Sequence, residues 1–141
     1  MSVQYGANQP EYDLMIAKAE KILKVSVKGS QDGKWGLAQK YLNKADYHRA
    51  AEVLLSKHDK KTIFCFVQFE GTELNELPRI YLATPEEIAN RLKESAGGRG
   101  SSILFEHHEW GHRAASTGKT DKIPANWKFS NERIEELFEF A

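Results

Sequence analysis

The sequence has a single cysteine and no long apolar segment. Cys65 has no second cysteine with which to pair, which excludes the disulfide-rich class of small secreted domains. The longest strongly apolar run, residues 62–69, is interrupted by Gln68 and is much too short to cross a bilayer. Residues 1–20 lack the basic flank and apolar stretch of a secretory signal. We therefore predict a cytoplasmic protein without membrane contact, in which Cys65 is a small core residue.

The chain has no formal net charge at pH 7, because 20 Lys and Arg residues balance 20 Asp and Glu residues. The charges are nevertheless unevenly distributed along the chain. Residues 18–61 contain 11 Lys or Arg and 5 Asp or Glu, whereas residues 62–96 contain 3 and 6. A basic segment of this kind attracts phosphate groups, so nucleic acid is a candidate partner of residues 18–61.

Hydrophobic residues make up 40% of the 141 residues, which excludes an intrinsically disordered chain and suits one domain with its own core. Residues 1–10 show no periodic apolar pattern and end in Pro10, so we expect an extended N-terminal arm. Residues 11–141 are then expected to form a single domain.

Short apolar and alternating segments predict the strands of a sheet. Residues 12–17 and 22–28 are separated by a polar tetrapeptide, as in an antiparallel strand pair. Residues 62–69 are apolar at successive positions, which is typical of a strand covered on both faces. Residues 34–37 are expected to be either a third short strand or the lead-in to a helix, and a further strand is expected at 79–82. Helices are expected at 46–56, 84–95 and after Ser130, which caps the last helix. The predicted class is α/β, with a mixed, mainly antiparallel sheet of four or five strands flanked by helices.

The first two predicted strands bring polar groups to one edge. Strand geometry places Lys24, Ser26 and Lys28 on one face of the second strand and leaves the other face apolar. The apolar face consists of Leu23, Val25 and Val27. Asp13 on the first strand can approach the polar face, where a carboxylate binds a divalent cation and a lysine stabilises charge developing on a phosphate.

At these residues the chain resembles the PD-(D/E)XK nuclease superfamily, which has the restriction-endonuclease-like fold. Glu11-Tyr-Asp13 stands where that superfamily has Pro-Asp, and Ser26-Val-Lys28 stands where it has (Asp/Glu)-X-Lys. The resemblance implies a Mg²⁺-dependent nuclease-like protein that acts on or binds nucleic acid. It also implies that Asp13 is a metal ligand, that Lys28 stabilises the attacked phosphate and that Ser26 takes the place of a second ligand.

The order of elements extends this resemblance. The apolar strand at 62–69 is followed by a loop and by residues 79–88, which run from strand into helix, and this order is similar to uncharacterised bacterial members of the superfamily. The resemblance covers about residues 11–95.

Two features depart from the superfamily pattern. Ser26 replaces a metal-binding carboxylate, so another acid such as Asp32 or Glu70 would have to complete a Mg²⁺ site. The glutamate-bearing helix that usually precedes the Asp strand has no counterpart in the ten N-terminal residues. Its absence leaves one sheet face uncovered, which predicts a homodimer. A non-catalytic module that uses residues 18–61 to bind nucleic acid or a protein is therefore an alternative.

A second pattern, H-E-x-x-H, occurs at residues 108–112. On a helix, His108 and His112 would share one face and bind Zn²⁺, while Glu109 would act as base on the metal-bound water. Glu132 lies 24 residues beyond His108, a spacing similar to that of the third ligand in glutamate-liganded zinc peptidases. A zinc-dependent metallopeptidase is therefore the other alternative, and a His-rich polar loop or short helix near a sheet edge is the competing interpretation.

The remaining candidates have structural explanations. Trp35 and Trp127 could stack on bases, but tryptophans in a domain of this size usually belong to the core. Residues 97–100, Gly-Gly-Arg-Gly, lack the preceding strand and the following Lys-Ser/Thr of a phosphate-binding loop, so we expect a flexible hinge there.

Overall fold

The computed structural model describes residues 1–5, 12–111 and 119–140. The strands are β1 (Ser2–Tyr5), β2 (Leu14–Lys18), β3 (Lys21–Ser30), β4 (Lys34–Gly36), β5 (Thr62–Gln68), β6 (Arg79–Ala83), β7 (Ile103–Phe105), β8 (His107–Glu109) and β9 (Thr120–Lys122). The helices are α1 (Tyr47–Ser56), α2 (Pro85–Glu94) and α3 (Asn131–Phe140), with short 3-10 turns η1 (Gln39–Tyr41), η2 (Ser95–Gly98) and η3 (Ala125–Trp127). None of the helices in these residues is both long and apolar enough to span a membrane.

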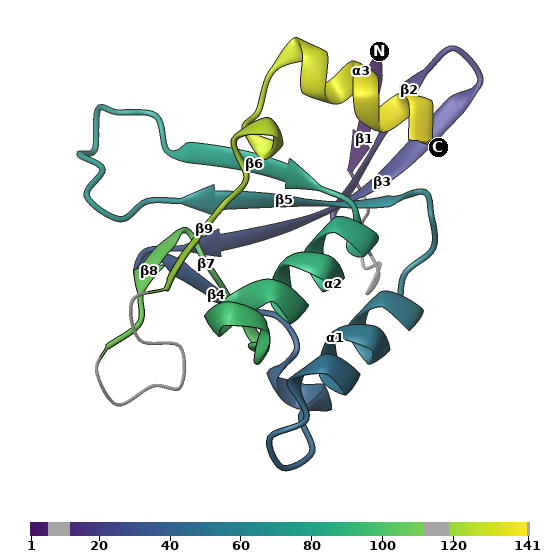
Figure 1. Ribbon diagram of the computed structural model, residues 1–141. Coiled ribbons are helices and arrows are strands. Elements are labelled where there is room, and N and C mark those ends of the chain that lie inside the picture. The colour runs from purple at the N-terminus through teal and green to yellow at the C-terminus, as the bar shows by residue number, and fades with distance from the viewer. Residues whose placement is uncertain (6–11, 112–118, 141) are drawn as a thin grey trace.

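Five strands form the main sheet, in the order β1-β2-β3-β5-β6. β3 and β5 run parallel, and every other neighbouring pair is antiparallel. The connection from β3 to β5 contains β4, η1 and α1, because parallel strands require a long crossover. Figure 1 shows α3 on one side of this sheet and α1 and α2 on the other. The predicted α/β class with a mixed, mainly antiparallel sheet is therefore confirmed.

The predicted antiparallel pair at the start of the chain is β2 with β3, in which Leu14 pairs with Val25. Part of the predicted N-terminal arm belongs to the sheet, because β1 pairs antiparallel with β2 and forms one edge. The rest of that arm, residues 6–10, lies outside the described residues.

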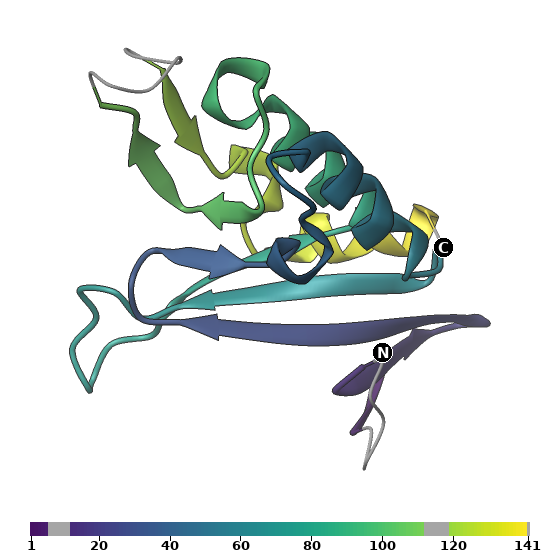
Figure 2. The same ribbon diagram turned by 90° about the horizontal axis from the view of Figure 1, so that it is seen from below.

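β5 contributes to two hydrophobic cores because its side chains alternate between the two sheet faces. Phe64 and Phe66 pack against α1 and α2, while Ile63 packs against α3. Figure 2 shows α1 and α2 as a layer over β3 and β5. Cys65 lies on the α3 side, partly buried, and burial raises the pKa of its thiol to about 11. A strand covered on both faces was predicted for this segment and is confirmed.

α3 covers only part of its face of the sheet. Leu23 and Val25 are buried beneath it, but Val27 is 37% exposed. The prediction that Val27 packs with these two residues is therefore wrong, because Leu137 and Phe138 of α3 contact only the first half of β3. The homodimer expected from an uncovered sheet face stays a prediction.

Side-chain caps fix the starts of the three helices. The Asp46 carboxylate accepts a hydrogen bond from the Arg49 amide at 3.1 Å and so caps α1. Thr84 and Glu87 form a capping box at α2, with both reciprocal hydrogen bonds present. The Ser130 hydroxyl accepts from the Arg133 amide at 3.0 Å at the start of α3. The three predicted helices are therefore confirmed.

The segment after α2 takes part in two small sheets. In one, β7 pairs with β4 from the crossover, and in the other, β8 pairs with β9. Glu106, between β7 and β8, ties this segment to β6. It accepts hydrogen bonds from Arg79 Nε at 2.7 Å and Nη2 at 2.9 Å, and from the Tyr81 hydroxyl at 2.5 Å. The hydrogen bond from Arg79 holds the pKa of Glu106 below its ordinary value of 4.5, while burial and Glu106 raise the pKa of Tyr81 to about 12.

This cluster predicts a pH-dependent contribution to stability. Because the pKa of Glu106 is lower in the folded state, its contribution is present above about pH 4.5 and is lost as the pH falls through the folded-state pKa. We expect Glu106→Gln to lower the free energy of unfolding by about 1 kcal/mol at pH 7, a value that allows for the exposure of Arg79. Urea unfolding at pH 7 and pH 3 measures this, and an equal difference from wild type at both pH values would contradict it.

Candidate nucleic-acid interface

Asp13 precedes β2 and is attached to β3 by two hydrogen bonds. Its amide donates to the carbonyl of Val25 at 2.8 Å, and its Oδ2 accepts from the amide of Val27 at 2.7 Å. Because Leu14 pairs with Val25, the position of Asp13 lies opposite Ser26. The structure thus brings Asp13 and Ser26 together.

Lys28 lies on the same face of β3 as Ser26, two residues further along the strand. Its Nζ lies 6.0 Å from the centroid of the Phe64 ring. Its carbonyl oxygen accepts a hydrogen bond from Nε1 of the buried Trp35 at 3.0 Å. Trp35 therefore fixes the backbone from which the Lys28 side chain extends.

A cleft of about 830 Å³ opens over this face of β3, bounded by η1 and the C-terminal end of α1. Three of its wall residues are lysines: Lys28, Lys40 and Lys57. Tyr41, His58 and Phe64 contribute rings, Ser26, Ser56 and Thr62 contribute hydroxyl groups, and Leu37 and Leu54 contribute apolar surface. A cleft with lysines at its wall and rings and hydroxyl groups between them suits a phosphate-bearing ligand.

Among the described residues that line the cleft, Asp59 is the one carboxylate, and its charge is already compensated. It pairs with Lys24 at 3.2 Å and accepts hydrogen bonds from the amide of Lys61 at 2.8 Å and the hydroxyl of Thr62 at 3.2 Å. Burial raises the pKa of the Asp59 carboxyl, but these hydrogen bonds outweigh burial and leave the pKa below its ordinary value. Asp59 is therefore ionised and neutralises Lys24, so the three cleft lysines remain as excess positive charge.

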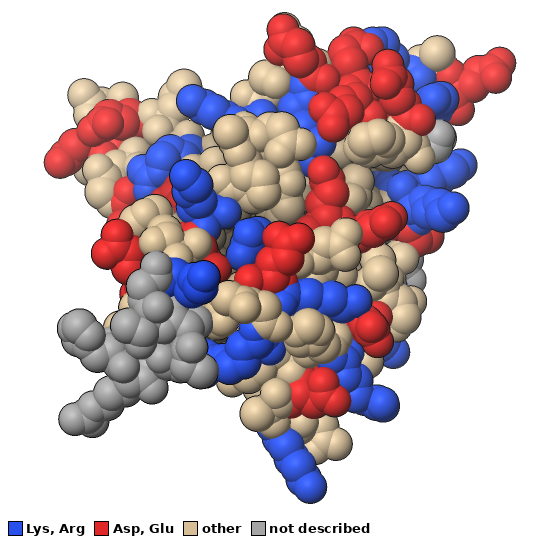
Figure 3. All heavy atoms as spheres, in the orientation of Figure 1, with Lys and Arg blue, Asp and Glu red and all other residues tan. Residues whose placement is uncertain are grey.

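The acidic side chains gather elsewhere. Figure 3 shows Asp and Glu side chains clustered over α3, which lies on the opposite side of the sheet from the cleft. α3 itself contains Glu132, Glu135, Glu136 and Glu139. Glu135 pairs with Lys18 and Glu136 with Arg133, so only part of this negative charge is compensated. The distribution of charge therefore favours an anion at the cleft over an anion at α3.

The donors beside the cleft do not fit a Mg²⁺ ion. Asp13 supplies one carboxylate, of which Oδ2 is bonded to the amide of Val27, and Ser26 supplies a neutral hydroxyl that is buried. Within residues 1–5, 12–111 and 119–140, no three His, Cys, Asp or Glu side chains lie close enough together to hold a metal ion. Mg²⁺ needs near-octahedral oxygen ligands and usually one or two carboxylates, so we derive no hydrolytic step from these donors.

The two acids that could have completed the set belong to other contacts. Asp32 follows the end of β3 and accepts a hydrogen bond from the Ser30 hydroxyl at 2.9 Å. Glu70 follows β5, and its carboxylate lies beside Gly33 in the turn after β3. Both acids are thus at the end of the sheet away from Ser26.

The helix that zinc binding by the H-E-x-x-H pattern would require is not formed at its first residues, because His107–Glu109 forms β8 and pairs with β9. In a strand, the side chains of His108 and Glu109 point to opposite faces. The His108 ring stacks on Phe105 with a centroid distance of 4.3 Å and meets Trp110 edge-on at 4.7 Å. Local aromatic packing and pairing with β9 therefore determine the conformation here.

The other two residues of the zinc prediction do not restore it. Glu132 lies in α3, across the main sheet from β8. His112 lies outside the described residues. The zinc site accordingly stays a prediction without a described ligand set.

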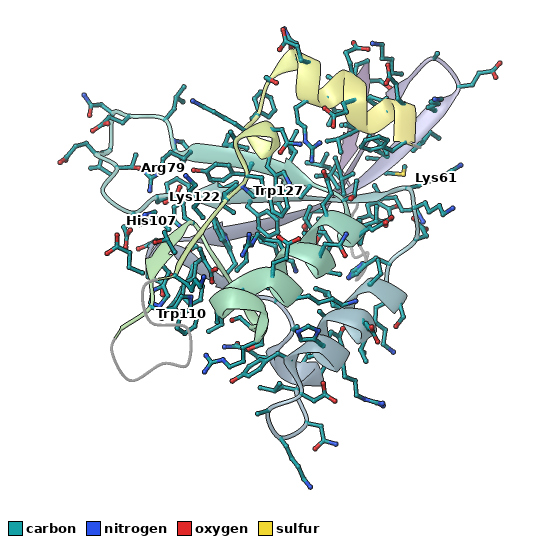
Figure 4. The ribbon with its side chains drawn as sticks, in the orientation of Figure 1. Lys61, Arg79, His107, Trp110, Lys122 and Trp127 are labelled. Carbon is teal, nitrogen blue, oxygen red and sulfur yellow. The ribbon has the colours of Figure 1, made fainter. Side chains whose placement is uncertain are left out.

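Both tryptophans considered for base stacking, Trp35 and Trp127, are buried in the core as expected. Figure 4 shows Trp127 in the middle of the molecule, and Trp110 beside the turn that follows α2. No sequence pattern singled out Lys40, Lys57 or Tyr41 as candidate site residues. The signal for them was only the general excess of positive charge in residues 18–61.

Comparisons with protein-family models, with curated proteins and with solved structures found no match to this chain.

Proposed function

We propose that this chain is a nuclease-like protein that binds nucleic acid in the basic cleft and does not cleave it. The observation that carries the proposal is the cleft itself, in which Lys28, Lys40 and Lys57 are in excess over a single neutralised carboxylate. Each lysine can contact one phosphate and release the counterions condensed around it. The hydroxyl groups and Tyr41 add hydrogen bonds and a ring for stacking.

Two observations support the nuclease-like part of the proposal. The fold is a mixed five-stranded sheet flanked by helices, as the resemblance implies. Ser26 and Lys28 also lie on one face of β3 in the cleft wall, and Asp13, directly before β2, lies opposite Ser26. The incomplete donor set for Mg²⁺ favours binding over hydrolysis, because Ser26 replaces the second carboxylate.

We expect the variant Lys28→Gln to weaken binding of a fluorescein-labelled 12-nucleotide single strand about tenfold at about 0.1 M salt. It removes one phosphate contact, so the slope of log K against log salt should fall by about 0.7 for a single strand. Lys57→Gln should have the same effect, because it lines the same cleft. Fluorescence anisotropy over a range of salt concentrations measures both quantities.

Lys128→Gln is the matched control, because Lys128 is exposed and does not line the cleft. It should change neither the affinity nor the slope. Equal losses in the control and the cleft variants would contradict a specific role of the cleft. Mg²⁺-dependent cleavage that disappears in both Asp13→Asn and Lys28→Gln would replace the binding proposal with that of a phosphodiester hydrolase.

A further inference from the structure

The turn after α2 presents one arginine, Arg99, on a closely fixed backbone. The turn has positive φ at Ala96, Gly97, Gly98 and Gly100. A hydrogen bond from the amide of Gly100 to the carbonyl of Ser95, at 2.9 Å, closes it. Gly100 is required there because an added Cβ would lie 2.8 Å from Cβ of Tyr47.

The Arg99 side chain is exposed but held between two aromatic rings. Its Cζ lies 5.2 Å from the centroid of the Trp110 ring and 6.0 Å from that of Tyr47. No carboxylate within the described ranges forms an ion pair with it. A guanidinium that is positioned by stacking and lacks a counter-ion retains its N–H fork for an anion, and phosphate matches that fork in two-point geometry.

Both rings are themselves fixed by the fold. Tyr47 is the first residue of α1, immediately after the Asp46 cap. Trp110 donates from Nε1 to Oδ2 of the buried Asp121 at 3.0 Å. On the same turn, the carbonyl of Gly98 lies 2.8 Å from Nε2 of His48 in α1. The fold therefore fixes the backbone of the turn and the two rings beside Arg99.

Arg99 lies at one end of α1 and the cleft at the other. The turn contacts the start of α1, whereas Leu54, Ser56 and Lys57 at its end line the cleft. A second connection runs through Ser102, whose carbonyl accepts from the amides of Leu37 and Ala38, directly before η1 in the cleft wall. Figure 2 shows η2, the start of α1 and η1 following one another toward β3. Ten helical residues separate the two sites by about 15 Å.

We propose that Arg99 is a second phosphate contact and that the ligand is a polynucleotide extended along α1 from the cleft to Arg99. The span of about 15 Å corresponds to about four or five nucleotides along one strand of B-form geometry. The ligand class is thus a nucleic-acid chain and not a free nucleotide. This inference rests on the proposed function, since it assigns the same ligand to both sites.

The test compares wild type, Arg99→Gln and Arg99→Lys in binding the labelled 12-nucleotide single strand. We expect Arg99→Gln to weaken binding about tenfold and to lower the salt slope by about 0.7. Arg99→Lys should retain the salt slope, because it keeps the charge, but should recover only part of the affinity, because an ammonium cannot bind phosphate through a planar fork. Lys128→Gln is again the control, and thermal unfolding of each variant confirms that the fold is intact.

The outcomes separate this inference from the proposed function. If Arg99→Gln binds as wild type does while Lys28→Gln binds weakly, the second contact is wrong and the cleft stands. If wild type does not bind the strand at all, both fail. A loss of affinity in Arg99→Gln without any change in the salt slope would also contradict a phosphate contact.

Discussion

Replacing Asp121 with alanine is expected to lower the free energy of unfolding by about 3–5 kcal/mol, because it removes the buried member of an ion pair with Arg91 and leaves three further donors without their acceptor. Asp121 is 4% exposed. Its carboxylate accepts hydrogen bonds from Arg91 Nη2 at 3.1 Å, from Trp110 Nε1 at 3.0 Å, from the amide of Ala96 at 3.2 Å and from the hydroxyl of Ser95. Four donors thus converge on one side chain of β9: one from α2, two from the turn after α2, and Trp110, which directly follows β8.

The variant Asp121→Asn separates charge from shape. The amide keeps one acceptor oxygen but presents N–H groups to donors, so we expect a loss between that of alanine and wild type. Glu109→Ala, at an exposed position of the neighbouring strand β8, should leave stability nearly unchanged. Urea unfolding at pH 7 measures all three variants. A loss below about 1 kcal/mol for Asp121→Ala would show that the network is not needed to hold this segment.

The elements of this fold that are encoded locally could be predicted from the sequence. Asp46, Thr84 and Ser130 each stand just before a helix, and each accepts the hydrogen bond that its position predicts. The alternation in residues 22–28 likewise predicts a strand with two different faces. Caps and strand periodicity act over a few residues, so they are readable without knowledge of the rest of the chain.

Contacts between distant segments explain where such predictions fail. Val27 belongs to the apolar face of β3, but whether it is buried depends on how far α3, more than a hundred residues later, extends over the sheet. Zinc binding by the pattern at residues 108–112 would require a helix, but pairing of β8 with β9 makes His107–Glu109 a strand. In both cases tertiary contacts overrule the local pattern.

The part of the candidate site that depends on local strand geometry could be predicted, and the part that depends on tertiary contacts could not. Ser26 and Lys28 lie on β3, and Asp13 directly precedes β2, which a short turn joins to β3, so strand geometry alone brings the three residues together. The cleft requires Lys40 in η1 and Lys57 after α1 to come next to Lys28, which depends on the crossover from β3 to β5. The position of the turn that carries Arg99 depends in addition on the long-range hydrogen bonds of Asp121. The excess of positive charge can be counted in the sequence, but only the fold shows which of the charged side chains lie together.

Replacing Arg133 with alanine is the second large effect that we expect, with a loss of about 3–5 kcal/mol in the free energy of unfolding. Arg133 of α3 is 2% exposed. Its guanidinium donates to the carbonyl of Leu82 at 3.1 and 2.9 Å, to Glu87 at 2.6 Å and to Glu136 at 3.0 Å. Truncation leaves the carboxylate of Glu87 without its charged partner and leaves a cavity between α3 and β6.

A matched exposed pair shows whether burial is the cause. Lys93 and Glu52 form an ion pair at 3.2 Å between α2 and α1, with the Glu52 side chain 65% exposed. Lys93→Ala should cost less than about 1 kcal/mol, because solvent screens such pairs. Equal losses for Arg133→Ala and Lys93→Ala in urea unfolding would contradict the argument.

Glu87 also caps α2 through the amide of Thr84, so Arg133 links α3 on one side of the sheet to the start of α2 on the other. Its loss should therefore destabilise both layers together, in a single unfolding transition with a lowered midpoint.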